Sequence, residues 1–384
     1  MVSFKDKIVF LEGNYKLLKD TFFILIFSML LVLSCKKTSE EKEVLATQTD
    51  TCWDGHIEVI PNQKFDSLFT RKNDGWTGGD ATYSIVLNDS TNLWIFGDTF
   101  LGEVNADKSR SNTEPLINNT FIIQTENTFK TLYGGTPEKP EALIKPPQEN
   151  WWYWPGHGQI YNNTLQIMMF ALGKPDEDIG IGFEYKAVDL VTLSLPDFKV
   201  ISNHRRMLFK GINYGAFLLK EGDYTYIYGA EREATAKYLH VARVKGSDIS
   251  QDWEYLSDDD SWKTTMDNSK KLFKSVAEQF SVFKRKDDFY LMTQNYDLDP
   301  ELFMYSGKSP VGPFSNQQTI YCTPETDGDI ITYNAFVHEQ FSTDENLLIS
   351  YNINSLKFED IFTNSDNYRP RFINVEGWSK TNNN

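Results

Sequence analysis

The sequence predicts an all-β fold, a five-bladed β-propeller, and three observations support this prediction. Long helical periodicity is hard to find beyond residue 52. Instead, an apolar strand, a short turn rich in Asn, Asp or Gly, and a strongly aromatic strand recur along the chain. Five such hairpins, with turns about 58 to 74 residues apart, leave room for two more strands in each unit. A β-sandwich and an irregular β-solenoid are the alternatives.

The N-terminal segment has the features of a lipoprotein signal peptide. Two lysines precede an apolar run of about 13 residues, too short to span a membrane but suited to a signal-peptide core. The run ends in Leu-Val-Leu-Ser-Cys35, which resembles a bacterial lipobox and implies cleavage before Cys35 and lipidation of that residue. An ordinary signal peptide is the alternative. The expected organisation is a signal peptide over 1–34, a lipidated flexible tether over 35–51 and a propeller domain over 52–380.

The expected location is therefore the bacterial cell envelope, with a lipid anchor in the outer membrane and the domain on its surface or periplasmic face. Disulfides can form in such a compartment. Two cysteines remain after lipidation, Cys52 and Cys322, which either form a disulfide or stay as two unpaired thiols.

The first hairpin contains the most informative pair of residues. The apolar run Tyr83–Leu87 leads into the turn Asn88–Thr91, and Leu93–Phe96 leads out of it. Asp80 lies about nine residues before the centre of this turn, and Asp98 lies about nine residues after it. Opposed or diagonal residues of an antiparallel pair have Cβ atoms about 4.5–8 Å apart. We therefore expect the two aspartates to lie side by side.

Two carboxyl groups held this close favour acid–base chemistry. They cannot both ionise at low cost, so the pKa of one is raised and it becomes an acid while its neighbour stays a base. Gly-Asp pairs are also common turn formers, and a turn role is the alternative for either aspartate alone. Their mirror placement around one turn favours the catalytic interpretation for Asp80 and Asp98 together.

The other four hairpins predict a ring of polar residues around the propeller axis. Their turns are Asn162–Asn163, Glu221–Asp223, Lys286–Asp288 and Asp344–Asn346. In a propeller the second strand of each blade returns to the face where the inner strand begins, so residues about eight or nine positions from each turn converge there. A hydrogen-bonded core or rim position is the alternative for each of them. The candidates are Glu278 as a catalytic residue, and His157, Tyr214, Glu231, Asn295, His338 and Asn352 as substrate-binding residues.

Tryptophans next to this face suggest a stacking platform for sugar rings. The cluster Trp151-Trp152-Tyr153-Trp154 precedes the second inner strand, and Trp151 and Trp154 are its candidate substrate-binding residues. Trp76, four residues before Asp80, is another candidate. Hydrophobic closure between blades is the alternative.

The composition argues against several other functions. The chain has 54 acidic and 38 basic residues and a net charge of −16, so nucleic acid is not an expected partner, because phosphate binding requires concentrated Lys and Arg. GxSxG, P-loop and dinucleotide-binding motifs are absent from the sequence. Cysteines and histidines are too few and too scattered for a zinc site. We expect no metal and no cofactor; an axial Ca²⁺ is compatible with the sequence but not demanded by it.

Several strings resemble those of a bacterial five-bladed β-propeller family formerly described only as a domain of unknown function. They are GGDATYS, IFGDTFLG, YNAFVHEQF with LLISYNINS, and YRPRF, and the resemblance spans about residues 53–376. That family is related to arabinanase-like glycoside hydrolases and includes endo-D-arabinanases. The resemblance implies that Asp80 and Asp98 are catalytic and that Glu278 can serve as the acid. Where the family has His-Pro-Glu, this chain has His338-Glu339-Gln340.

Two functions follow as hypotheses. The first is a monomeric lipoprotein glycoside hydrolase that cuts a polysaccharide, an arabinan or another furanoside polymer, by carboxylate acid–base catalysis. The second is a non-catalytic glycan-binding surface lipoprotein that uses the same face and tryptophans.

Overall fold

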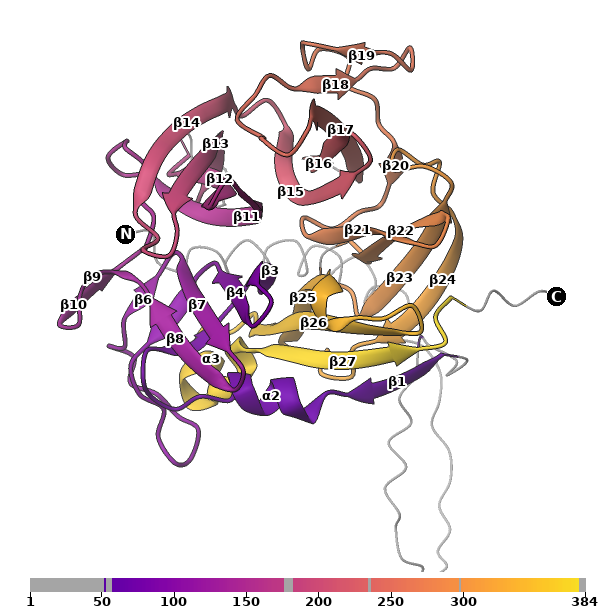
Figure 1. Cartoon of the computed structure of the whole chain (residues 1–384). Coiled ribbons are helices and arrows are strands. Elements are labelled where there is room, and N and C mark those ends of the chain that lie inside the picture. Colours follow the sequence, from indigo (N-terminus) through magenta and orange to yellow (C-terminus); the bar gives the residue numbers. More distant parts are fainter. Residues whose placement is uncertain (1–51, 53–56, 176–181, 234–235, 297, 380–384) are drawn as a thin grey trace, which may run out of the picture.

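The computed structural model describes residues 52, 57–175, 182–233, 236–296 and 298–379. Its strands form five antiparallel sheets of four or more strands, arranged in a ring around a central axis (Figure 1). This is a five-bladed β-propeller, and the predicted fold class is confirmed. The segments predicted as signal peptide and tether, including Cys35, lie outside the described residues.

Each blade runs from an inner strand at the axis to an outer strand at the rim. Blade 1 contains β3 (Tyr83–Asn88), β4 (Thr91–Phe96), β7 (Thr120–Thr125) and β8 (Thr128–Leu132). Blade 2 contains β11 (Trp152–Tyr161), β12 (Thr164–Gly173), β13 (Glu184–Ser194) and β14 (Val200–Leu208). Blade 3 contains β15 (Ile212–Glu221), β16 (Tyr224–Arg232), β17 (Lys237–Lys245), β18 (Glu254–Leu256), β19 (Trp262–Lys263) and β20 (Phe273–Lys274).

The ring is completed by two further blades. Blade 4 contains β21 (Phe280–Arg285), β22 (Asp288–Gln294), β23 (Glu301–Gly307) and β24 (Ser315–Cys322). Blade 5 contains β25 (Ile330–Val337), β26 (Asn346–Ser355), β27 (Pro370–Glu376) and β1 (Glu58–Pro61).

The inner and second strands of each blade form the hairpin that the sequence predicts. The residues that flank the two-residue turns are Asn88 and Thr91, Tyr161 and Thr164, Glu221 and Tyr224, and Arg285 and Asp288. Asn162 and Asn163 have φ angles of 45° and 57°, as tight hairpin turns require and asparagine tolerates. In blade 5 the connection is longer and contains a 3₁₀ helix, η1 (Glu339–Phe341).

Four inner strands contain β-bulges or irregular pairing. The pairing shifts between Val86 and Asn88 in β3, between Pro155 and Gly158 in β11, between Tyr214 and Phe217 in β15, and between Tyr333 and Phe336 in β25. A bulge adds residues to one strand only, so it changes which side chains face the axis beyond that point.

The first strand of the domain closes the ring. β1 pairs antiparallel with β27, with Glu58 opposite Glu376, and so supplies the outer strand of the last blade. Cys52 and Cys322 form a disulfide across a sequence separation of 270 residues. The start of the domain is therefore held by hydrogen bonds to blade 5 and by a covalent bond to blade 4.

Short elements cover the junction between blades 1 and 5. They are a small sheet of β2 (Trp76–Gly79), β5 (Thr99–Leu101) and β6 (Leu116–Ile117), and the helices α2 (Gln63–Phe69), α3 (Asp360–Thr363) and η2 (Ser365–Tyr368). A separate hairpin of β9 (Gly134–Thr136) and β10 (Lys139–Glu141) lies in the connection from blade 1 to blade 2. The buried Phe65 and Phe69 of α2 pack against Trp94 of blade 1 and Phe372 of blade 5. Within the described residues, no helix is long and apolar enough to cross a membrane.

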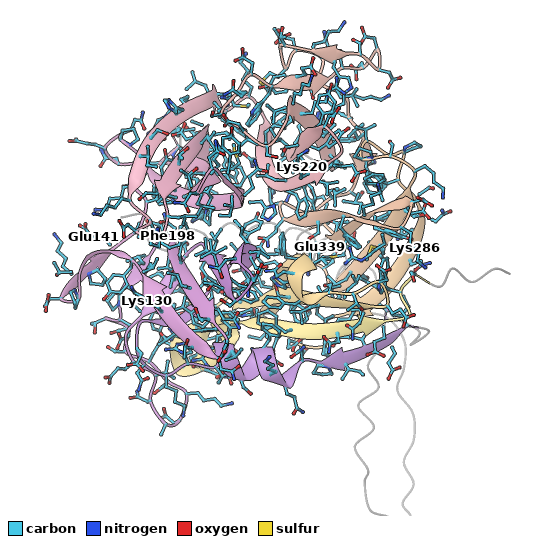
Figure 2. The ribbon with its side chains drawn as sticks, viewed as in Figure 1. Lys130, Glu141, Phe198, Lys220, Lys286 and Glu339 are labelled. Atoms are coloured by element: carbon cyan, nitrogen blue, oxygen red, sulfur yellow. A yellow bond between two sulfur atoms is a disulfide. The ribbon has the colours of Figure 1, made fainter. Side chains whose placement is uncertain are left out.

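Side chains fill the spaces between the blades (Figure 2). Near the axis the rings of Tyr83, His157, Phe217 and Phe336 contact one another with centroids 4.7–5.9 Å apart. Lys220 and Lys286, both labelled in Figure 2, mark the turn end of two hairpins. The opposite end, where the inner strands begin, carries the candidate site.

Candidate active site

Asp80 and Asp98 lie opposite each other at the end of the blade 1 hairpin. Asp80 precedes β3 and Asp98 follows β4, and the Asp80 N–H donates to the Asp98 carbonyl at 3.3 Å. The N–H of Gly97 donates back to the Asp80 carbonyl at 2.9 Å. The backbone positions thus meet as the hairpin predicts.

Asp98 is 2% exposed and joins blade 1 to the start of blade 2. Its Oδ1 accepts hydrogen bonds from Nε1 of Trp154 at 2.9 Å and from Nδ2 of Asn118 at 3.0 Å. These two N–H donors fix the orientation of the Asp98 carboxyl group. The indole of Trp154 is consequently fixed to the aspartate pair.

Asp80 is half-buried, and its surroundings come from blade 5 and from η2. Its Oδ2 accepts a hydrogen bond from the Tyr333 hydroxyl at 2.9 Å. Burial raises the pKa of Tyr333 well above its usual value, and the charge of Asp80 adds to this; the same two causes, in the same order, raise the pKa of Tyr368. Both phenols therefore remain protonated near Asp80 at neutral pH.

Glu278 reaches the same end of the propeller from the start of blade 4. Its Oε1 lies 3.2 Å from Nζ of Lys237 and 3.2 Å from Nε of Arg232. Its Oε2 accepts a hydrogen bond from Nδ2 of Asn213 at 3.3 Å. Burial acts to raise the pKa of Glu278, but the charges of Lys237 and Arg232 and these hydrogen bonds outweigh it, so the pKa is lowered.

This lowered pKa changes the role expected for Glu278. A general acid must hold a proton near neutral pH, whereas the two cations favour the ionised form of this carboxylate. Burial lowers the pKa of its partner Lys237 to about 7, opposed by the charge of Glu278. Only 24% of the Glu278 side chain is exposed, against 47% for Arg232.

Blades 1 and 4 are joined directly beside these carboxylates. Nε2 of Gln279, the residue after Glu278, donates to the carbonyl of Ala81, the residue after Asp80. Burial, followed by the charge of Glu278, raises the pKa of Tyr83 and of Tyr185, which places both phenols close to that carboxylate. Asp80 and Glu278 therefore lie on neighbouring parts of one face.

The tryptophans at the start of blade 2 lie beside the aspartate pair. Trp151 and Trp154 are partly exposed. The guanidinium of Arg205 lies 5.2 Å from the Trp151 ring, and the ring of Phe183 meets Trp154 edge-on at 4.8 Å. Both indoles keep surface that a sugar ring could use.

Four other predicted substrate-binding residues are instead buried in the core. Trp76 packs against Phe69 and Phe96, and the Tyr214 hydroxyl bonds Ser269. His338 is 0% exposed, its two ring nitrogens bond Ser84 and Ser350, and burial lowers its pKa to about 3. Asn352, also fully buried, donates to Gly79 and Thr82. Burial removes these side chains from the face where a substrate would bind.

The remaining three candidates have partners of their own. His157 stacks between Tyr83 and Phe217, its Nδ1 accepts the N–H of Leu218 at 3.1 Å, and burial lowers its pKa to about 4. Asn295 bonds Asp299 at 3.0 Å within the loop after β22. Glu231 contacts His240 and Lys271 at 3.2 and 3.3 Å.

Sequence reasoning missed several residues that contact the carboxylates. They are Asn118, Asn213, Lys237, Tyr333 and Tyr368. Tyr333 and Tyr368 are the first residues of two of the strings that carry the family resemblance, YNAFVHEQF and YRPRF. Lys237 is the first residue of β17, the third strand of blade 3. Counting residues from a hairpin turn covers only the first two strands of a blade, so it could not indicate Lys237.

The described residues contain no group of three or more His, Cys, Asp or Glu side chains placed to hold a metal ion.

The fold and the site define a class of protein: a five-bladed β-propeller that gathers aspartate and glutamate side chains, with phenols and indoles, at one end of its axis. The chain belongs to the family described as Domain of unknown function (DUF5005), whose profile matches residues 62–378. A comparison with proteins of curated function finds no significant match.

Three solved structures illustrate what this chain is similar to. A crystal structure from Bacteroides ovatus, provisionally assigned as a hydrolase, is 25% identical with a TM-score of 0.72 and aligns over 88% of this chain and 98% of that one. A Bombyx mori β-fructofuranosidase solved with sucrose is 11% identical with a TM-score of 0.46, over 81% and 62% of the two chains. An α-L-arabinofuranosidase from Podospora anserina solved with cellotriose is 9% identical with a TM-score of 0.44, over 80% and 93%.

Proposed function

We propose that this protein is a glycoside hydrolase that cuts a polysaccharide, an arabinan or another furanoside polymer, by carboxylate acid–base catalysis. The observation that carries the proposal is that Asp80, Asp98 and Glu278 come from two blades to one end of the axis, each with hydrogen-bond partners that fix it. Partly exposed Trp151 and Trp154 lie beside them and supply stacking surface. A pair of carboxyl groups is what glycosidic hydrolysis requires.

The different surroundings of the carboxylates suggest different roles. Asp80 is half-buried, accepts a hydrogen bond from the Tyr333 hydroxyl and lies beside the buried Asp98. One carboxyl group of this aspartate pair is the proposed proton donor to the glycosidic oxygen. Glu278, held ionised by Lys237 and Arg232, is the proposed base or nucleophile.

The direct test is a product screen with matched variants. The protein from Thr51 onward would be incubated with L-arabinan, D-arabinan and other polysaccharides, beside Asp80→Asn, Asp98→Asn and Glu278→Gln. Each variant should lose about 10²–10⁴ in turnover. Asp89→Asn is the control, because Asp89 is exposed in the turn at the far end of the same hairpin and should retain full activity.

Two other outcomes would change the conclusion. Near-wild-type turnover by both aspartate variants would remove the acid–base assignment. Binding of one polymer without product release, lost in Trp151→Ala or Trp154→Ala, would identify a non-catalytic glycan-binding protein. If products form, the anomeric configuration of the first product decides between retention and inversion.

A further inference from the structure

Blade 3 contains a second cluster of reactive side chains that the proposed function does not use. Oγ of Ser269 lies 3.0 Å from Nδ1 of His240, and Nε2 of the same imidazole lies 3.2 Å from Oε2 of Glu231. Lys271 lies 3.3 Å from the same Glu231 oxygen. A hydroxyl, an imidazole and a carboxylate in series is the arrangement that activates a serine nucleophile.

The three residues come from separate elements of the blade. Glu231 is the penultimate residue of β16, His240 lies in the adjacent β17, and Ser269 lies between β19 and β20. Asn268 has a positive φ of 58°, so the chain turns sharply before Ser269. Asn268 is exposed and Ser269 is half-buried, which places the serine just below the surface.

The surroundings of His240 keep it ready to accept a proton. His240 is 1% exposed, and burial lowers its pKa although the charge of Glu231 opposes this. The imidazole is therefore neutral at neutral pH. If its Nε2–H is donated to Glu231, Nδ1 carries a lone pair that faces the Ser269 hydroxyl.

A further donor lies next to the serine. The Tyr214 hydroxyl is 2.7 Å from Ser269 Oγ, and burial raises the pKa of Tyr214, so the phenol keeps its proton. A tyrosine hydroxyl is one of the groups that can donate a hydrogen bond to a developing oxyanion.

We propose that Ser269, His240 and Glu231 form a second hydrolytic site, which removes short acyl groups esterified to sugar hydroxyls. Ser269 Oγ attacks the ester carbonyl carbon while its proton passes to His240 Nδ1. The bond between the carbonyl carbon and the sugar oxygen then breaks, and the sugar oxygen takes the proton from His240. A water molecule attacks the acyl-Ser269 ester in the same way, which releases the carboxylic acid and restores the serine.

The choice of a sugar ester rests on the function proposed for the axial face. Glu231 is followed by Arg232, which contacts Glu278 at 3.2 Å. The second site is therefore adjacent to the carboxylates that would bind a glycan, and a polymer held there would bring its substituents close to Ser269.

The test uses two probes that need no knowledge of the glycan. The protein would be treated with a fluorophosphonate, which reacts with activated serines, and assayed with p-nitrophenyl acetate. We expect one adduct, mapped to Ser269 by peptide mass spectrometry, and acetate release that is lost in Ser269→Ala. Glu231→Gln and His240→Gln should lower the labelling rate about 10²-fold.

Ser261→Ala is the matched control, because Ser261 lies in the same region of blade 3 and its hydroxyl donates to Asp259, which lies on the surface. It should label like wild type. Absence of an adduct on wild-type Ser269, or labelling and acetate release that persist in Ser269→Ala, would overturn the proposal. Neither probe contains a glycosidic bond, so failure here is distinguishable from failure of the glycosidase proposal.

Discussion

At the residue scale, the position of Asp80 depends on the absence of a side chain at Gly97. A Cβ atom built on Gly97 would lie 2.5 Å from Oδ1 of Asp80, closer than any real contact of this kind. Gly97→Ala should therefore displace the carboxylate and lower glycan turnover about 10²-fold. Turnover and thermal unfolding measured together test this, and an active, normally folded Gly97→Ala variant would show that Asp80 need not occupy this position.

Lys237 leads to a prediction about pH and stability. Burial lowers its pKa from 10.5 to about 7, so between these values the unfolded chain binds a proton that the folded protein does not. Stability should therefore rise with pH across this window, by up to about 1.4 kcal/mol per unit. Lys237→Met should lack this contribution.

Urea unfolding from pH 7 to 9.5 measures the effect. Lys220→Met is the matched control, because Lys220 is exposed and its removal should leave the wild-type slope. Equal slopes for wild type and Lys237→Met would contradict the lowered pKa.

The sequence allowed the aspartate pair to be predicted but not its neighbours. Asp80 and Asp98 are related by one local turn, and their backbone contact follows from counting residues. Lys237 and Tyr333 reach the carboxylates from other blades, and no local pattern encodes how far a side chain extends across the axis.

At the scale of secondary-structure elements, β11 places Trp154 against Asp98. The Trp154 N–H donates to Oδ1 of that aspartate at 2.9 Å, while the adjacent Trp152 and Tyr153 are buried. Trp154→Phe keeps an aromatic ring but removes a donor to a charged acceptor, a bond worth about 1.5–3 kcal/mol. We expect turnover to fall at least about 10-fold, as judged by kcat and KM.

Trp151→Phe is the control, since Trp151 contacts Arg205 through its ring and phenylalanine preserves a ring there. Equal losses in both variants would indicate a loss of stacking surface rather than of the hydrogen bond to Asp98.

The bulges explain why several site residues were predicted wrongly. Counting outward from a turn assumes strict alternation of side chains, but β15 and β25 each contain extra residues, after Tyr214 and Tyr333 respectively. The count was therefore out of register beyond the bulges, where it assigned the buried Tyr214 to the face and missed Tyr333, which contacts Asp80. Gly215 and Asn334, both with positive φ, lie within two of the bulges, and a glycine inside a strand pattern is the local signal that could have indicated one.

At the scale of the whole molecule, closure of the ring brings the two ends of the domain together. Removing the Cys52–Cys322 bond by Cys322→Ser should lower the free energy of unfolding by about 2–5 kcal/mol, because the bond restricts a loop of 270 residues in the unfolded chain. Urea unfolding of the oxidised wild type and of the variant tests this. Reduced wild type should behave like the variant, and an unchanged midpoint in both would contradict the prediction.

The five hairpins were predictable because each is local, with strands joined by two-residue turns in four of five blades. The pairing of β1 with β27 was not, because Glu58 and Glu376 lie at opposite ends of the domain. Local patterns of polar and apolar residues specify which side chains of a strand point into the core. They do not specify which strand far away in the sequence will pair with it.

The position of the disulfide also has a mechanical consequence. A pull applied to the segment before Cys52 reaches that residue before it reaches β1, and the covalent bond passes the load to Cys322 at the end of β24. The hydrogen bonds between β1 and β27 are thereby shielded from tension. If the domain is held through its N-terminal segment, a force from a bound polymer would therefore not separate β1 from β27 in the last blade.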